Sequence, residues 1–346
     1  MLQLLQPRNS TQYVISGTKY LRLGSRSIFN LYGTNLQNIE KDARKMYLCD
    51  VGCKLNQRDQ SGAEALIVAY LCRHGQFREL FLNNIKPHVF VALHLFREIW
   101  KEKIKSENLD IHADIDKLCS TSISNLRANP FFKSVDKLIK SSDNWKPSER
   151  YYYIAKMVCH ASNYGIRAGA FCINSLEKSR GKIALTKKQA EFFLDMYHSL
   201  FPEIREWHRE VEQQVLSTKM LFNLFGEPIM FTGSLEKEND FKEAISAVPQ
   251  STVGEITNVA CMKFQNYVED TGMNWDLLGN CHDSFLTQSP EDESVECQRV
   301  MKEFIEPELT SPRGEKFKMK SEGGSGYNWG PHDEKKNPRG LQEVEL

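Results

Sequence analysis

Apolar residues recur at helical spacing through most of this chain of 346 residues. The pattern predicts helices over residues 61–73, 87–105, 148–165 and 251–269, and two amphipathic helices between 185 and 216 that are separated before Pro202. The segment 87–105 opens with Pro87 and closes with lysines, which suit the first and last turns of a helix. Helices therefore dominate the middle of the chain.

Strand-like segments stand toward the two ends. Residues before 50 are rich in Asn, Ser, Gly and Thr, which is typical of loops and short strands. Residues 277–290 are apolar at both ends and polar in the middle, which predicts a β-hairpin whose tip carries function. Residues 106–150 are polar with weaker periodicity, and we expect the polar tail from Pro331 to be disordered. Strands at both ends with helices between them predict an α+β fold, with a sheet assembled from sequence-distant segments.

The composition is that of an ordinary globular protein of about two domains, with 40% hydrophobic and 26% charged residues. The longest apolar run covers residues 65–72 and is too short to span a membrane. The first ten residues lack the features of a signal peptide, so we expect a cytoplasmic protein, in the host cytoplasm if it is viral. Nine scattered cysteines favour reduced thiols over a disulfide framework.

Basic residues cluster although 45 Lys and Arg balance 45 Asp and Glu. Residues 1–50 carry seven Lys or Arg against three acids, and residues 133–156 carry six against three. Either cluster could attract phosphate, although each alone is more typical of a solvated surface.

Two acidic residues are candidates for a metal site. Asp59 ends a strand-like stretch just before the helix that carries Glu64, and Asp283 lies at the tip of the predicted hairpin. If both strands belong to one sheet, Asp59 and Asp283 converge at its edge and could hold two Mg²⁺ ions, which prefer hard oxygen ligands. Taken alone, each aspartate is better explained as a helix cap or a turn residue.

The helix over 148–165 carries a second candidate group. Lys156, His160 and Tyr164 recur every four residues and therefore lie on one helical stripe. A cation, a flat ring and a phenol in this order could meet the phosphates, base and sugar of a nucleotide. An apolar core stripe is the alternative, but a lysine at its start fits a core poorly.

These segments resemble motifs A, B and C of the family A DNA polymerases, particularly of the bacteriophage branch. Further similar segments occur in the family's order and extend the resemblance over about residues 15–330: TNLQNI ahead of motif A, PHVFVALHLF, FPEIREW and LFGEP in the fingers, VPQST beside the DNA minor groove, and GYNWG near the end. Any one of these motifs alone would be weak.

The resemblance implies a right-hand polymerase fold. Residues 1–73 and 241–346 would form the palm, an antiparallel sheet followed by a polar tail, and residues 74–240 would form mostly helical fingers with the motif B helix at about 148–165. The thumb and the proofreading exonuclease would be reduced or absent, because about twenty residues precede Arg22. We therefore expect either a separate chain that supplies thumb, exonuclease or processivity function, or a truncated gene.

The resemblance also implies a role for each matching residue in template-directed addition of dNTPs to a primer in primer-template DNA. Asp59, Asp283 and the carbonyl of Gln60 would hold two Mg²⁺ ions, for which Mn²⁺ could substitute, and Lys156 would neutralise the triphosphate. The dNTP would contact Gln60, Glu64, Arg150, Lys156, His160 and Tyr164, with Glu64 and Tyr164 excluding ribonucleotides. The DNA would contact Arg22, Asn35, Gln37, Asn38, Gly165, Gln250 and His282.

Two departures from the family pattern keep alternatives open. Tyr152 stands where an arginine is common, so the triphosphate either loses a cation or receives one from Arg150. Ser284 follows Asp283 where a glutamate is common. His-Asp-Ser also occurs in single-subunit RNA polymerases, whereas Glu64 and the NLQNI segment resemble the DNA enzymes. A catalytically silent, polymerase-like DNA-binding subunit is the non-enzymatic alternative.

Overall fold

The chain divides into two compact units in this computed structural model, which describes residues 11–14, 23–26, 35–106, 114–232 and 238–346. One unit, here called the sheet unit, comprises Met1–Glu64, Met220–Met230 and Ala247–Leu346. The other, here called the helical unit, comprises Ala65–Lys219 and Phe231–Ser246. Both units have their own buried apolar core.

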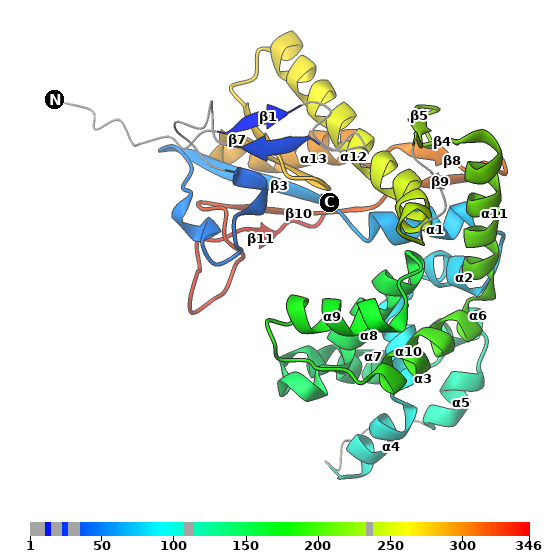
Figure 1. Cartoon of the computed structure of the whole chain (residues 1–346). Helices are drawn as coiled ribbons and strands as arrows, with labels where there is room; N and C mark the ends of the chain where they lie inside the picture. The colour runs from blue at the N-terminus through cyan, green and yellow to red at the C-terminus, as the bar shows by residue number, and fades with distance from the viewer. Residues whose placement is uncertain (1–10, 15–22, 27–34, 107–113, 233–237) are drawn as a thin grey trace. The chain divides into compact units, whose positions relative to one another are not determined.

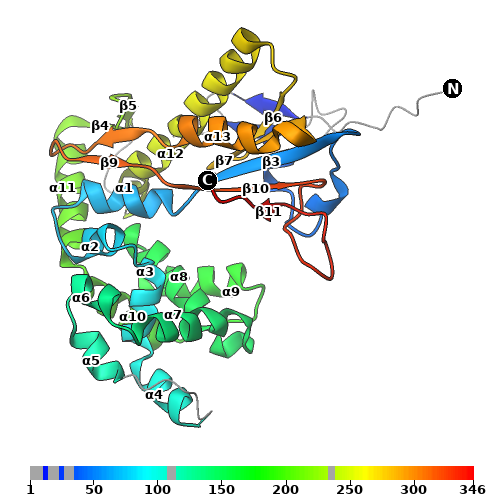
Figure 2. The ribbon, with the colours of Figure 1, turned by 180° about the vertical axis from the view of Figure 1, so that it is seen from behind.

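A five-stranded antiparallel sheet forms the centre of the sheet unit (Figure 1). Its strand order is β11 (Gln342–Glu343), β10 (Ser321–Gly326), β3 (Cys53–Gln60), β7 (Ser284–Pro290) and β6 (Asp276–Asn280). The helix α13 (Ser294–Ile305) lies along one face, as Figure 2 shows, and the Gln298 side chain donates to the Gln57 carbonyl at 3.3 Å. The predicted α+β fold, with a sheet built from both ends of the chain, is confirmed.

Short elements complete the sheet unit. Three two-stranded sheets pair β1 (Gln12–Val14) with β2 (Gly24–Arg26), β4 (Met220–Phe222) with β5 (Pro228–Met230), and β8 (Glu308–Thr310) with β9 (Lys316–Lys318). Single 3₁₀ turns are η1 (Leu36–Asn38), η2 (Arg44–Met46) and η5 (Glu291–Glu293). The β4–β5 hairpin, which we expected within the fingers, clusters with the sheet unit because Asn223 donates to the Glu255 carboxylate at 2.5 Å and Thr252 accepts from the Leu224 amide.

The helical unit is built from α2 to α11. These are α2 (Gln76–Leu82), α3 (Pro87–Leu95), α4 (Arg97–Ser106), α5 (Ile115–Ser120), α6 (Ile123–Ala128), α7 (Phe132–Ser141), α8 (Tyr151–Asn163), α9 (Ala168–Lys178), α10 (Lys187–Leu200) and α11 (Pro202–Thr218), with 3₁₀ turns η3 (Ser142–Asn144) and η4 (Pro147–Glu149) before α8. Its core includes the fully buried Phe77, Trp100 and Tyr197. Helices α1 (Ala63–Leu71) and α12 (Glu238–Thr271) contribute residues to both units.

Most predicted helices are confirmed, and three expectations need correction. The segment 87–105 is two helices, since α3 ends before Phe96 and α4 begins after it. Polar residues 106–150 include three short helices, whose apolar residues, such as Leu126 and Val135, are buried. The last predicted helix starts thirteen residues before Ser251, at Glu238, and runs through Pro249, because buried residues such as Val248 and Val253 flank the proline on both sides.

The expectation of a disordered tail is wrong. Residues from Pro331 return to the sheet, where β11 pairs with β10 and the Leu341 amide donates to the Gly330 carbonyl at 2.8 Å. Leu341 packs against a buried cluster that includes Leu55 and Trp329. A polar sequence is ordered here because one apolar anchor and strand pairing hold it. Among the described residues, no helix is both long and apolar enough to cross a membrane.

Candidate active site

The sheet brings Asp59 and Asp283 together. Asp59 lies next to the last residue of β3, and its strand partner on β7 is Ser284, the neighbour of Asp283. The Gln60 amide donates to the Asp283 carbonyl at 2.9 Å. The predicted convergence of these two acids is confirmed, whereas their role as metal ligands stays a prediction.

The turn after β3 places Glu64 at the start of α1. Gly62 has a φ of 62°, which costs little only for a residue without a Cβ atom. This conformation lets the chain pass from strand to helix within two residues, so that Glu64 lies in the first turn of α1. The Gln60 side chain is buried and donates to Thr257 Oγ1 at 2.7 Å, which anchors the end of β3 to α12.

The turn between β6 and β7 holds Asp283 in a tight geometry. The Cys281 amide donates to the Ser284 carbonyl at 2.7 Å, and the Asp283 amide donates to the Cys281 carbonyl at 3.0 Å. His282 has a φ of 70°, an uncommon value for a residue with a side chain. Such a conformation persists only where the surroundings determine it, so the hairpin tip is a strongly constrained part of the sheet.

A third carboxylate and two cationic side chains, which the sequence analysis did not select, act electrostatically at this acidic pair. Glu322 on β10 is the strand partner of Asp59. Burial by surrounding protein, Asp283 and then Glu322 raise the pKa of Asp59 to about 7, while Lys41 and Arg44 act in the opposite direction. Lys41 and Arg44 belong to the basic cluster in residues 1–50, but nothing in the sequence placed this cluster beside Asp59.

The donor set at this edge fits a hard divalent cation. Asp59 and Asp283 carry like charges close together, and this repulsion is one reason for the raised pKa of Asp59. Carboxylate and carbonyl oxygens are the ligands that Mg²⁺ prefers, with water and substrate phosphate filling other positions. Within the described ranges, no group of three or more His, Cys, Asp or Glu residues is placed so that it could hold a metal ion.

The second candidate group lies on α8 in the helical unit. Lys156 and His160 are exposed, and the ring of His160 meets the ring of Tyr164 edge-on at 5.1 Å between centroids. The helix ends at Asn163, so the buried Tyr164 is its C-cap rather than a residue within it. Gly165 follows with a φ of 63° and ends the helix. The stripe is present, with its third member one residue beyond the helix.

His88 belongs beside this stripe and was not selected from the sequence. It lies on α3, and its ring contacts that of Tyr152 at 6.0 Å between centroids. Burial, and then the nearby charges of Lys156, Lys86 and His160, together lower the pKa of His88 to about 4. Its Nδ1 atom is buried, with no hydrogen-bond partner in the described structure. The PHVFVALHLF segment contained this residue, but no local pattern marked it.

Arg150 is engaged within the protein. Its Nε atom donates to the Asp143 carbonyl at 2.8 Å, and a terminal nitrogen pairs with the Asp143 carboxylate at 2.9 Å. Its guanidinium also lies over the ring of Tyr153 at 4.5 Å. The role of Arg150 at a triphosphate stays a prediction.

The predicted DNA-contacting residues fall into different environments. Asn38 is exposed on η1, whereas Gln37 is buried and its Nε2 atom donates to the Asn280 carbonyl at 3.1 Å. Asn35 and Gln250 are partly buried. Arg22 lies outside the described residues.

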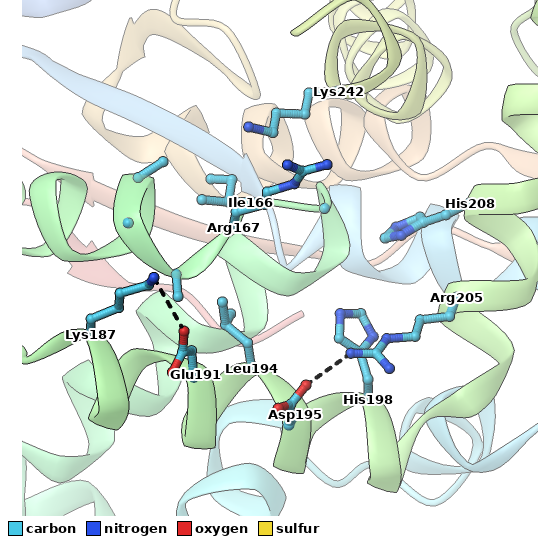
Figure 3. Close-up of a pocket in the computed structure, with 14 residues that line it drawn as sticks. Ile166, Arg167, Lys187, Glu191, Leu194, Asp195, His198, Arg205, His208 and Lys242 are labelled. Carbon is cyan, nitrogen blue, oxygen red and sulfur yellow. Dashed lines mark hydrogen bonds and ion pairs between the residues drawn. The ribbon is translucent and has the colours of Figure 1, made fainter. Parts of the chain in front are cut away.

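A cavity of about 820 Å³ opens beside Gly165 in the helical unit (Figure 3). Four cationic side chains line it against two acidic ones, namely Arg167, Lys187, Arg205 and Lys242 against Glu191 and Asp195. Burial lowers the pKa of His198 to about 3 and that of His208 to about 4, so both are neutral near pH 7. The lining therefore carries an excess of positive charge.

The model of a protein family described as DNA polymerase family A matches residues 132–331, which include α8 and the β6–β7 turn. This chain belongs to DNA polymerase family A. Among its relatives, DNA polymerase I of Treponema pallidum is 23% identical over 93% of this chain and 27% of its own length. DNA polymerase I of Caldicellulosiruptor bescii is 21% identical over 95% of this chain and 33% of its own length.

This family A chain thus spans about a quarter to a third of the length of these relatives. A DNA polymerase of Bacillus phage SP01 is 22% identical over 36% of the chain, and the assignment to a bacteriophage branch stays a prediction. The polymerase domain of Pol1 from M. smegmatis, solved with DNA primer-template and dNTP, has a TM-score of 0.65 over 92% of this chain and 47% of that one. At 18% identity this likeness supports the fold alone.

The departure at Ser284 has a structural explanation within the family A fold. Ser284 is 2% exposed, and its Oγ atom accepts from the Gln57 side chain at 2.9 Å. The residue therefore holds β3 and β7 together behind the acidic edge. A third carboxylate is present nearby, but Glu322 on β10 supplies it.

Proposed function

We propose that this chain catalyses template-directed addition of dNTPs to a primer 3′ end. The observation that carries the proposal is the convergence of Asp59 and Asp283 at one sheet edge in a family A chain. A relative without catalytic activity has no physical need for two mutually repelling carboxylates at this sheet edge. The observation therefore favours an enzyme over a catalytically silent subunit. Residues 1–73 and 241–346 serve as palm and residues 74–240 as fingers in this proposal.

The acidic edge performs the chemistry in this proposal. Asp59, Asp283 and the Gln60 carbonyl would hold two Mg²⁺ ions, which supply activation of the primer hydroxyl and stabilisation of the leaving phosphate when bound, with Mn²⁺ as a substitute. Lys41 and Arg44 partly balance the charge of Asp59 before substrate arrives. Their proximity lowers the cost of keeping several carboxylates together.

The exposed face of α8 receives the nucleotide. Lys156 neutralises negative charge that develops on the triphosphate, which is how cations act in phosphoryl transfer. His160 packs on the base, which any base accepts because each has a π-face. We add His88 as a further phosphate-facing candidate because it lies beside Lys156 and His160 and keeps a buried, unpartnered ring nitrogen.

Selection of the sugar falls to two residues. Tyr164 packs behind the ribose ring and Glu64 holds it there, so that a 2′-hydroxyl would clash or leave buried polar groups unpaired. The DNA would contact Arg22, Asn35, Asn38, Gly165, Gln250 and His282. The positive excess in the cavity beside Gly165 is compatible with a phosphate backbone passing nearby.

Primer extension with Mg²⁺ tests the proposal. We expect the full chain to extend a primer with dNTPs, and Asp59→Asn and Asp283→Asn each to lower the rate by about 100-fold or more, because each removes a metal ligand. Asp270→Asn is the control, since Asp270 is exposed on α12. Unchanged extension by either active-site variant would exclude the proposed metal site.

An RNA polymerase is the second candidate, favoured by the His-Asp-Ser sequence at 282–284. The same assay with rNTPs separates the two functions. Preferential use of rNTPs by the unmodified chain would favour RNA synthesis, and preferential use of dNTPs would favour DNA synthesis.

A further inference from the structure

Asn280, the last residue of β6, is tied to the N-terminal part of the chain through its main chain. The Tyr13 hydroxyl on β1 donates to the Asn280 carbonyl at 3.0 Å and accepts from the Asn280 amide at 2.7 Å. Gln37 donates to the same carbonyl at 3.1 Å. A single hydroxyl group therefore satisfies both main-chain groups of one strand residue.

The side chain of Asn280 continues this connection toward the hairpin tip. Its Nδ2 atom donates to Asn258 Oδ1 on α12 at 3.0 Å, and its Oδ1 atom accepts from the His282 amide at 3.1 Å. Asn280 is 6% exposed. The residue thus joins β1, η1 and α12 to the turn that presents Asp283.

The conformation of β6 leaves space for the Tyr13 side chain. A Cβ atom at Gly279 would lie 2.8 Å from the Tyr13 oxygen, closer than real contacts allow. The pairing of β6 with β7 also shifts register between Leu277 and Gly279. In the described part of the sheet, β6 is an outer strand. The Tyr13 hydroxyl therefore takes the place that a neighbouring strand would occupy at Asn280.

We propose that Tyr13, acting through Asn280, is a positioning residue for Asp283. The inference rests on the proposed function only in naming Asp283 as a metal ligand. His282 holds an uncommon backbone conformation between Asn280 and Asp283, and such a turn needs contacts on both sides to persist. Tyr13 contributes to these contacts on the β6 side together with Gln37 and Asn258, so strand β1 is part of the catalytic geometry.

Tyr13→Phe removes one oxygen atom and tests the proposal in the full chain. We expect faster hydrogen exchange in a peptide covering residues 278–284, and about tenfold weaker binding of Mn²⁺ measured by electron paramagnetic resonance, because the Asn280 amide loses its partner and the Asn280 carbonyl keeps only Gln37. The Mg²⁺ concentration for half-maximal primer extension should rise by a similar factor. Tyr267→Phe is the matched control, since the Tyr267 ring stacks on Trp275 at 6.0 Å.

The substitution Gly279→Ala provides an independent test of the proposal. In the unmodified chain the added methyl group displaces the Tyr13 hydroxyl and should reproduce the effects of Tyr13→Phe. In the Tyr13→Phe background the same methyl group enters vacated space, so its further effect should be at least threefold smaller. General destabilisation would instead give independent, additive effects.

Unchanged exchange at 278–284 in Tyr13→Phe would overturn the proposal, and so would additive effects of the two substitutions. Exchange requires neither metal nor DNA. An unmodified chain that binds no Mn²⁺ would contradict the proposed function, while exchange in the two variants would still decide whether Tyr13 positions the turn.

Discussion

At the proposed site, some side chains contribute charge and others contribute shape. The repulsion around Asp59 belongs to the sheet edge, whereas Lys156 and His160 are exposed on α8. Exposed residues can be exchanged with little effect on folding, and this makes their chemical roles separable from stability.

Glu64→Ala should ease ribonucleotide incorporation. In the proposed function this carboxylate holds Tyr164, so we expect its loss to lower the preference for dNTP over rNTP by about tenfold, equivalent to the loss of one charged hydrogen bond. The measurement is kcat/KM for both nucleotides in primer extension. Glu98→Ala, the same change in the first turn of α4, should leave the ratio unaltered. An unaltered ratio in Glu64→Ala would remove Glu64 from sugar selection.

Lys156→Gln should lower kcat/KM for dNTPs by about 100-fold, because the cation acts where charge develops in the transition state. The side chain is exposed, so the melting temperature should change by less than about 2 °C. Lys137→Gln on α7 is a control for loss of positive charge. Equal losses in both variants would point to general electrostatic attraction of DNA instead.

At the scale of elements, α12 is unusual because it contains a proline away from its ends. Pro249 lacks an amide hydrogen and normally costs about 3 kcal/mol inside a helix. Its burial among apolar neighbours keeps the helix continuous, as the structure shows. The helix also carries Gln250, so its path there bears on the proposed DNA contact.

Pro249→Ala should raise the free energy of unfolding by about 1–3 kcal/mol, since alanine restores the missing donor. Chemical denaturation followed by circular dichroism measures the change. Pro202→Ala is the control, because Pro202 opens α11, where proline is well tolerated. A loss of stability in Pro249→Ala would show that the proline is needed for packing.

At the scale of the whole molecule, ionisation should make the helical unit sensitive to acid. His88, His198 and His208 have pKa values lowered from 6.5 to about 4, 3 and 4, with burial as the first cause. The unfolded chain therefore binds protons at a higher pH than the folded chain. Stability is fully present above about pH 6.5 and is lost as the pH falls toward 4.

We expect each of these histidines to lower the stability of the helical unit by about 1–2 kcal/mol at pH 5 relative to pH 7.5. Hydrogen exchange in peptides from α3, α10 and α11 measures this unit alone. The pKa of Asp59 is raised by folding, so this residue stabilises the sheet unit as the pH falls, which is opposite in sign to the effect of the histidines on the helical unit. His208→Gln should reduce the difference, whereas pH-independent exchange stability would contradict the prediction.

The sequence by itself determined the features that depend on neighbouring residues. Helical periodicity located α1, α8, α10 and α11, since each repeats its apolar pattern over short distances. The sequence also indicated correctly that Asp59 lies at a strand end, Lys156 on a helix and Asp283 at a hairpin tip. Spacing along the chain was sufficient there because each feature depends on residues close together in the sequence.

Only the tertiary structure decided which distant residues meet. Lys41, Arg44 and Glu322 surround Asp59, and Tyr13 binds Asn280, although no local pattern connects them. The ordered tail likewise depends on the contact of Leu341 with a cluster formed elsewhere in the chain. Sheet register and burial create these contacts, and both are properties of the folded chain as a whole.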